Sequence, residues 1–346
     1  MKIMIDIGHP AHVHYFRNFI RIMESRGHQF LVTARRREHV AELLNYYGIP
    51  FIDRGKGGSS LLTKGLYLIS AVWKQYLRAR KFKPDLFLDF STIYSGPAAW
   101  LTGKPYVTFT DTENTRFYRR FIDPFCKVVY TPQCFPLNLG KHHRRFNGVM
   151  ELAYLHPNYF KPDPTVLESL NIKPEERFAI VRFVDWKALH DRGKHGFTLA
   201  GKVEMVKTLE QYGKVFVSSE GPLPHELEAN RLTIEPYRFH HLLFYATLLV
   251  SEGATMCSEA AMLGTPAIFL SDINLSYLNY LEDYYGLVLN FGTSPKEQRI
   301  ALKSAVTLFG RPGTKANAWV QSEKLFNDNI DVTQFMVEEI EALMEK

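Results

Sequence analysis

The sequence predicts an α/β protein built from two doubly wound parallel-sheet domains. The chain has 346 residues, which is too long for one small core and typical of about two domains. Short apolar runs alternate with segments of helical periodicity, and this alternating series occurs twice. Such alternation places helices on both faces of a parallel sheet. Between the two series, residues 149–165 contain Pro157, Pro162 and Pro164 and few periodic apolar positions, as in a linker.

In the first series, apolar residues three or four apart mark the helices, and short apolar runs mark the strands. Gly27 and Gly48 follow the first two expected helices, and Pro84 ends the third. The expected strands are Lys2–Ile7, Phe30–Thr33, Phe51–Ile52, Leu86–Phe90, Tyr106–Thr110 and Val128–Tyr130. The expected helices are 13–23, 40–47, Leu61–Lys81 and one that begins near Pro97.

The second series follows the linker and ends in an all-helical region, about 295–345. We therefore expect an acceptor-side N-terminal domain over 1–155, a nucleotide-sugar domain over 165–327, and a last helix, 328–346, that returns to the first domain. The expected strands are Phe178–Val184, Val215–Ser218, Leu232–Ile234, Leu248–Ser251, Ala267–Leu270 and Leu287–Leu289. The expected helices are Phe197–Tyr212, Phe239–Ala246, Met256–Leu263 and Leu275–Tyr285.

The composition excludes several classes of protein. Hydrophobic residues make up 46% and charged residues 23%, which are ordinary globular values and exclude wholesale disorder. No apolar run approaches the ~20 residues of a membrane span, and the start reaches Asp6 too soon for a signal peptide. Cys126, Cys134 and Cys257 form no CxxC pair, which argues against a disulfide framework or a zinc knuckle. We expect a cytoplasmic protein.

Charge is unevenly distributed along the chain. Residues 1–160 contain 23 Lys and Arg against 11 Asp and Glu, and the remainder contains 19 against 25. A basic half is typical of an anionic partner, although a solvated basic surface has the same composition. Phe117, Tyr118 and Phe121 lie between arginines, as in an interfacial helix, and no base-stacking motif accompanies them. We therefore expect peripheral contact with the inner face of a membrane, and no nucleic acid. The basic clusters are Arg35–Arg37, Arg116, Arg119, Arg120 and Lys141–Arg145.

The most informative motif runs from Ser251 to Leu270 and has the pattern strand, small-residue turn, helix, glycine, strand. Gly253 and Ala254 let a ligand approach the backbone, and the free N–H groups of the helix start, which includes Thr255 and Ser258, favour phosphate. Glu259 follows about one turn later, within reach of ribose hydroxyls. A plain β-turn-α unit, capped by Thr255 or Ser258, would have the same pattern.

The first strand ends in a histidine-rich loop that contains His9, His12 and His14. A loop between a first strand and a first helix is a usual ligand site of open α/β sheets. One imidazole could be a general base. The alternatives are a metal site, to which Asp111 and Glu113 are among the available carboxylates, and surface or helix-capping histidines. Neither GxGxxG nor GxxxxGK[ST] is present, so neither a dinucleotide site nor a P-loop is supported.

Two further basic features suit an anionic ligand or an acceptor. Arg182 ends an expected strand near the linker, where a guanidinium would suit a diphosphate, and a structural salt bridge is the alternative. The segment from Arg54 to Ser60 is basic and glycine-rich, as in an acceptor loop or a flexible connection.

Taken together, these stretches resemble a family. Ser95–Ala98, Gly103–Pro105 and Thr110–Asn114 are similar to the acceptor side of MurG-like glycosyltransferases, and Ser251–Leu270 is similar to their donor site. His12-Val13 falls where those enzymes have a glycine-rich G-G-H-V. The chain resembles GT-B-type sugar-nucleotide proteins, namely these enzymes and the UDP-N-acetylglucosamine 2-epimerases, and it looks closest to the group labelled domain of unknown function 354.

The resemblance implies a GT-B fold, in which two Rossmann-like domains face each other across a cleft. It makes Glu259 the ribose-hydroxyl acceptor and places phosphate at the helix start Gly253–Thr255. His12 becomes the candidate base, and Asn274 or Asn279 contacts the donor sugar. The departures are a single glycine, Gly8, in the opening loop, and Glu252 where the family has a small neutral residue.

The implied function is transfer of a sugar from a nucleotide diphosphate donor, expected to be a UDP-sugar, to an acceptor glycan or lipid-linked sugar. Such a step belongs to cell-surface polysaccharide or glycolipid biosynthesis, and by resemblance it needs no metal and no cofactor. Three alternatives stay open. An epimerase would use Asp111 and Glu113 for elimination and re-addition, a metallohydrolase would use His9, His12 and His14, and a sugar-nucleotide sensor would bind without turnover.

Overall fold

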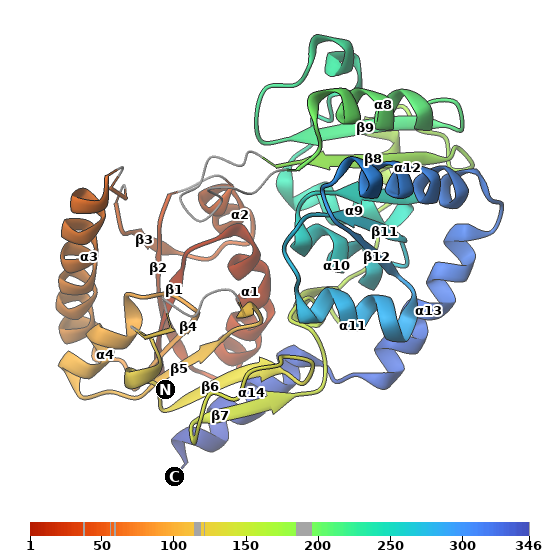
Figure 1. Cartoon of the computed structure of the whole chain (residues 1–346). Helices are drawn as coiled ribbons and strands as arrows, with labels where there is room; N and C mark the ends of the chain where they lie inside the picture. The colour runs from red at the N-terminus through yellow and green to blue at the C-terminus, as the bar shows by residue number, and fades with distance from the viewer. Residues whose placement is uncertain are drawn as a thin grey trace. The chain divides into compact units, whose positions relative to one another are not determined.

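The computed structural model describes residues 1–36, 39–55, 57–58, 60–113, 119–120, 122–184 and 196–345. The chain divides into two compact units, which are Met1–Tyr154 with Ile330–Lys346, and Leu155–Asn329. Each unit is a parallel sheet flanked by helices, so the predicted fold class is confirmed (Figure 1). Among the described residues, no helix combines the length and the apolar character that crossing a membrane requires.

The first unit contains a seven-stranded sheet in the order β3-β2-β1-β4-β5-β6-β7, and every neighbouring pair is parallel. Its strands are β1 (Lys2–Ile7), β2 (Gln29–Ala34), β3 (Phe51–Asp53), β4 (Leu86–Phe90), β5 (Tyr106–Phe109), β6 (Val128–Pro132) and β7 (His143–Phe146). Its helices are α1 (Pro10–Ser25), α2 (Val40–Tyr46), α3 (Leu61–Phe82), α4 (Ser95–Thr102), α6 (Leu152–Leu155, which ends at the unit boundary) and α14 (Val332–Met344), with a short 3₁₀ turn at Asp123–Phe125. Helices α1 and α14 pack together, and α3 packs on α4.

Two strands differ from the sequence prediction. Strand β7 reads His-Arg-Arg-Phe, so it has no apolar run that local periodicity could detect, and it forms by pairing with β6 at the sheet edge. The expected strand Leu232–Ile234 was wrong. Only an isolated bridge between Val217 and Arg231 forms there, since the segment is confined between a 3₁₀ turn and Pro236.

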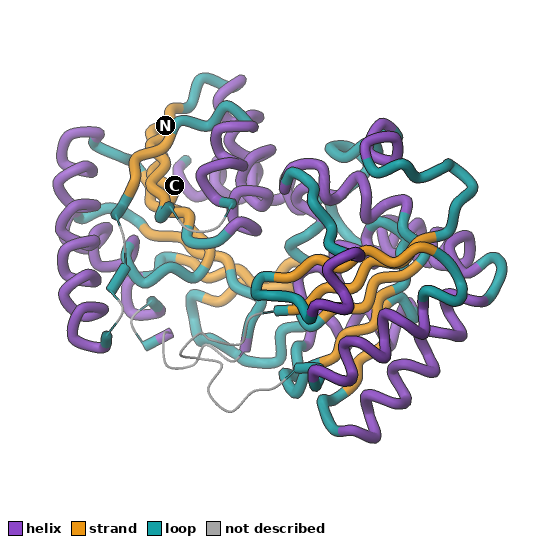
Figure 2. The backbone as a smooth tube through the Cα atoms, turned by 90° about the horizontal axis from the view of Figure 1, so that it is seen from above, coloured by secondary structure: helices purple, strands orange, loops and turns teal. Residues whose placement is uncertain are grey.

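The second unit contains a five-stranded parallel sheet in the order β12-β11-β10-β8-β9. Helices flank its strands on both faces in Figure 2. The strands are β8 (Phe178–Phe183), β9 (Lys214–Ser219), β10 (Leu248–Ser251), β11 (Ala267–Leu270) and β12 (Val288–Phe291). The helices are α7 (Thr165–Ser169), α8 (Leu199–Leu209), α9 (Phe239–Tyr245), α10 (Ala254–Met262), α11 (Ser276–Tyr285), α12 (Pro295–Gly310) and α13 (Thr314–Asp328), with 3₁₀ turns at His225–Asn230 and Pro236–Arg238.

Each sheet has one point where the strand order reverses. In the first unit this point lies between β1 and β4, and in the second it lies between β8 and β10. Ligands of open parallel sheets bind beyond the carboxyl ends of the strands at such a point, because the connecting helices diverge there. These two edges are therefore where a site is expected.

Candidate functional site

The turn between β10 and α10 lies at the switch point of the second sheet. The buried Ser251 hydroxyl accepts a hydrogen bond from the Gly253 N–H at 2.9 Å, which fixes the turn. Gly253 is the N-cap residue of α10, and within the described part of the chain no side chain caps this helix. The N–H groups of Ala254 and Thr255 lack partners in the helix, and both residues are only half-buried. The helix start can therefore accept an anion.

Glu252 explains one departure from the family pattern. Its carboxylate accepts the Val184 N–H at 2.7 Å and the Phe197 N–H at 2.6 Å, and its side chain is buried. Val184 follows β8 and Phe197 precedes α8, so one carboxylate fastens both segments to the turn before Gly253. We infer that Glu252 positions this turn and does not itself contact a ligand.

Glu259 lies one turn into α10 and is 6% exposed. One of its carboxylate oxygens, Oε1, is 2.9 Å from Nε2 of the buried His240, in α9. Sequence reasoning missed His240, whose only local signal is a pair of histidines in an aromatic helix. The Ser258 hydroxyl is also buried and donates to the Thr255 carbonyl at 3.4 Å, inside the helix.

The remaining residues predicted on the donor side lie at the same sheet edge or before the next helix. Arg182 is the penultimate residue of β8, in register with Ser251, but its guanidinium donates to Ser218 at 2.8 Å and to Glu220 at 2.5 Å. This pairing favours the alternative of a structural salt bridge. The exposed Asn274 accepts a hydrogen bond from Asn279 at 2.7 Å, so the two alternative sugar contacts are neighbours.

In the first unit, the histidines of the opening loop point to different surroundings. His9 caps α1 by accepting the Ala11 N–H at 3.2 Å, as the capping alternative predicted. His14 is buried and stacks on Tyr154 with 5.1 Å between the ring centroids. Within the described ranges, no group of three His, Cys, Asp or Glu side chains is arranged to hold a metal. The three imidazoles therefore do not form one cluster.

His12 lies at the switch point of the first sheet. Its Nδ1 accepts the Gly8 N–H at 3.4 Å, and its ring packs against Phe90 at the end of β4. Burial lowers its pKa well below the usual 6.5, and the nearby His9 and Arg54 lower it further. An imidazole whose pKa is lowered in this way is neutral at neutral pH and can accept a proton.

Asp111 and Glu113 follow β5, which is two strands from β1 in the sheet order. Asp111 is buried and accepts a hydrogen bond from Thr112 at 2.8 Å. Burial, together with the charge of Glu113, raises its pKa to about 6. Asp89, inside β4, also has its pKa raised to about 6 by burial, a perturbation that a sequence pattern does not reveal.

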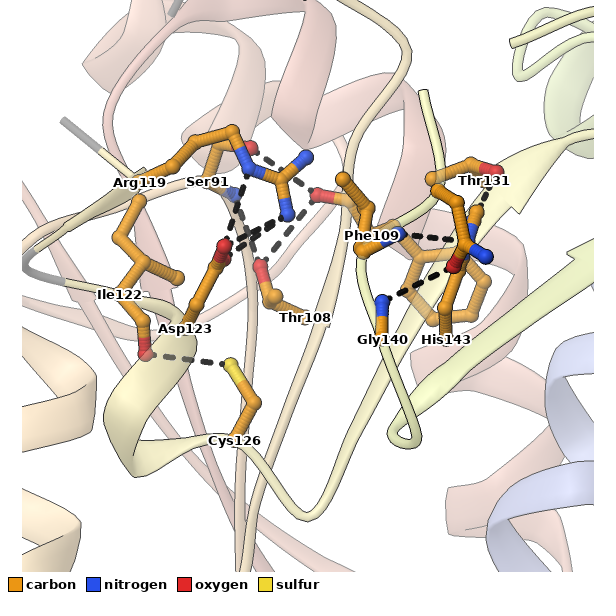
Figure 3. Close-up of polar contacts among 12 residues, drawn as sticks. Ser91, Thr108, Phe109, Arg119, Ile122, Asp123, Cys126, Thr131, Gly140 and His143 are labelled. Carbon is orange, nitrogen blue, oxygen red and sulfur yellow. Dashed lines mark hydrogen bonds and ion pairs between the residues drawn. The ribbon is translucent and has the colours of Figure 1, made fainter. Parts of the chain in front are cut away.

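The aromatic and basic segment expected to contact a membrane lies mostly outside the described residues, namely Arg116, Phe117, Tyr118 and Phe121. Its described arginine, Arg119, does not belong to an exposed basic face. It is 6% exposed and pairs with Asp123 at 2.9 Å. Figure 3 shows this contact. Assigning Arg119 to the membrane was therefore wrong, because a buried and paired guanidinium cannot reach lipid.

The cluster Lys141–Arg145 is also partly engaged within the first unit. Arg144 pairs with Glu339 of α14 at 2.8 Å. Arg145 donates to the carbonyl oxygens of Gln133, Phe135 and Leu137. These two arginines stabilise the edge of the first sheet.

Comparison with known proteins confirms the resemblance. An uncharacterized protein of Methanocaldococcus jannaschii is 23% identical over 278 residues, which cover 78% of this chain and 81% of that protein. A stretch of 90 residues, 25% of each chain, is 32% identical to the UDP-N-acetylglucosamine–N-acetylmuramyl-(pentapeptide) pyrophosphoryl-undecaprenol N-acetylglucosamine transferase of Coxiella burnetii.

Solved structures show the same fold. The UDP-GlcNAc 2-epimerase from Neisseria meningitidis, bound to UDP-GlcNAc, matches with a TM-score of 0.73 and 15% identity over 98% of this chain and 99% of that chain. The spinosyn forosaminyltransferase SpnP matches with a TM-score of 0.68 and 15% identity over 100% of both chains. The family model described as "Protein of unknown function (DUF354)" matches residues 1–283. The chain therefore belongs to the DUF354 family, and its two sheets have the GT-B fold of glycosyltransferases and UDP-GlcNAc 2-epimerases.

Proposed function

We propose that the protein is a glycosyltransferase that moves a sugar from a nucleotide diphosphate donor, a UDP-sugar, to an acceptor hydroxyl. Donor binding is assigned to the second unit and proton transfer to the first. The structural relatives include an epimerase bound to UDP-GlcNAc and a forosaminyltransferase, and this similarity supports a nucleotide-sugar ligand.

The observation that carries the proposal is the N-terminus of α10 at the switch point between β8 and β10. The helix start at Gly253–Thr255 would receive the diphosphate through the N–H groups of Ala254 and Thr255, and the negative charge of the diphosphate grows as the sugar leaves. Glu259 would accept a ribose hydroxyl while His240 holds its carboxylate in place. A charged hydrogen bond of this kind contributes about 1.5–3 kcal/mol.

In the first unit, His12 would remove the proton from the acceptor hydroxyl. Its low pKa supports this role because the neutral imidazole is the form that accepts a proton. Asp111, with its raised pKa, would assist as a second proton-transfer group, and Glu113 raises that pKa.

We also propose that the first unit contacts an anionic membrane through α3. The sequence of this helix contains five Lys and Arg and neither Asp nor Glu. Four apolar side chains, 48–69% exposed, recur along it at helical spacing, and Lys74, Arg80 and Lys81 are exposed beside them. An apolar stripe flanked by cations suits a peripheral site on anionic lipid. We call the four exposed apolar residues the α3 stripe; they are Leu66, Ile69, Trp73 and Leu77.

Donor binding tests the proposal most directly. UDP and UDP-N-acetylhexosamines should raise the melting temperature of the wild type, because a ligand that binds only the folded state stabilises it. The Glu259→Gln variant should show a much smaller shift. Glu204→Gln, the same change at an exposed position in α8, is the matched control and should respond like the wild type. Absence of a shift with every nucleotide would refute the assignment.

Product analysis then identifies the reaction. A transferase releases UDP only when an acceptor is present. UDP together with an altered N-acetylhexosamine, formed without acceptor, would instead identify an epimerase, and tight donor binding with no turnover in any acceptor mixture would identify a sensor.

A further inference from the structure

In the first unit, positively charged side chains surround the loop that follows β3 and begins at Arg54. Arg54 is 2% exposed, and its Nη1 donates to Asp6 at 2.5 Å. Its guanidinium also lies over the Tyr94 ring, 4.1 Å from the centroid. In the described part of the chain, the buried Arg54 Nε has no hydrogen-bond partner. A buried N–H without a hydrogen-bond partner is unfavourable, so the Nε–H group of Arg54 is available to donate to a ligand.

Three further cations surround the same segment. The Arg35 guanidinium lies only 2.6 Å from the position that a Cβ atom on Gly57 would occupy. The Lys74 ammonium lies 3.9 Å from the corresponding position on Gly55. Arg78 donates to the Asp53 carbonyl at 3.0 Å, and its buried Nη1 has no partner among the described residues.

The carboxylates nearby do not balance this charge. Asp6 pairs with Arg54, and Asp53 lies 3.4 Å from Arg36. Over the residues that the structure describes, no carboxylate lies within ion-pair distance of Arg35, Lys74 or Arg78. Burial lowers the pKa of Arg78, the charges of Asp6 and Asp53 oppose this shift, and the charge of Arg54 adds to it. Cations this close repel one another unless an anion lies between them.

The glycines are required by this arrangement. Gly55 has a φ of 95°, in the left-handed region that favours glycine. A side chain on Gly57 would collide with the Arg35 guanidinium. A side chain on Gly58 would collide with the backbone at Thr63 and Lys64, at the start of α3. The glycines therefore let the backbone lie close to the Arg35 and Lys74 side chains.

We propose that Arg35, Arg54, Lys74 and Arg78 form a site for a phosphate-type dianion, separate from the diphosphate site of the second unit. Arg54 also lowers the pKa of His12, so the site is electrostatically coupled to the proposed base. In the proposed reaction the anion would be a phosphate group of the acceptor, and that identification rests on the proposed function. The alternative source of the same chemistry is a lipid headgroup.

Calorimetry on the full-length protein tests the site. Pyrophosphate is titrated at low ionic strength with UDP present, so that the donor site is occupied. Wild type should bind it, and Arg35→Ala should weaken binding about tenfold or more, since a charged hydrogen bond is lost. Arg21→Ala removes the same charge from an exposed position of α1 and is the matched control. Absence of binding, or equal weakening by both variants, would overturn the proposal.

Two added measurements separate the sources of the anion and the two proposals. Displacement of the protein from phosphatidylglycerol vesicles by pyrophosphate, lost in Arg35→Ala, would identify a headgroup, whereas vesicle binding that is insensitive to pyrophosphate would identify a soluble or acceptor phosphate. UDP binding is measured in the same samples. A protein that binds UDP but not pyrophosphate refutes only the anion site, and one that binds pyrophosphate in an Arg35-dependent way but not UDP refutes only the donor assignment.

Discussion

Replacing Glu252 by glutamine should destabilise the second unit, because one carboxylate holds two backbone N–H groups. Both oxygens accept, at 2.7 and 2.6 Å, in a side chain that is 2% exposed. Glutamine has one acceptor oxygen, so its NH₂ group would face one of the two donors. Losing one charged hydrogen bond should lower the free energy of unfolding by about 1.5–3 kcal/mol. Glu252→Ala removes both bonds and should cost more.

Urea unfolding measures this change, and Glu204→Gln is the exposed control, expected to stay within about 0.5 kcal/mol of wild type. Hydrogen exchange gives a local measurement that general destabilisation would not reproduce. In Glu252→Gln, exchange at the amides of Val184 and Phe197 should accelerate more than exchange at the amides within β8. Donor affinity should fall as well, because the turn before Gly253 loses its anchor. An unchanged urea midpoint together with unchanged exchange at both amides would refute the reasoning.

Four further outcomes are expected. His12→Gln should lower kcat by about 10²–10⁴ with donor affinity unchanged in calorimetry. Because the pKa of His12 is lowered in the folded state, the free energy of unfolding should fall as pH falls below 6.5, and it should fall less in the variant. The raised pKa of Asp111 has the opposite effect on stability: the free energy of unfolding should fall by on the order of 3 kcal/mol as pH rises from about 4 to about 6. Asp111→Asn should flatten that part of the plot of urea midpoint against pH. Glu259→Gln should raise the UDP dissociation constant about tenfold or more in calorimetry, and equal affinity for every nucleotide would exclude the assigned ribose contact. Trp73→Glu should abolish flotation on anionic vesicles at low salt, whereas Trp100→Glu, an equally drastic change at an exposed position of α4, tests whether the α3 stripe is specific.

Local patterns determined the order and the bounds of most elements. The strands Lys2–Ile7, Leu86–Phe90, Leu248–Ser251 and Ala267–Leu270 have the predicted bounds, because an apolar run between turn residues is sufficient to specify a buried parallel strand. Sheet topology then placed His12 and the Gly253 turn at the two switch points, as the order of strands and helices implied. The site edges could thus be predicted from sequence alone.

Partners far apart in the sequence could not be predicted in the same way. Glu259 meets His240 in another helix, Glu252 holds Val184 and Phe197, and Arg54 is buried against Asp6. Each of these contacts depends on packing between elements that no local period encodes. The sequence by itself determined the two sheets and the loops at their edges, whereas only the tertiary structure decided which charged side chains are buried and paired, because burial and pairing arise when distant segments pack together.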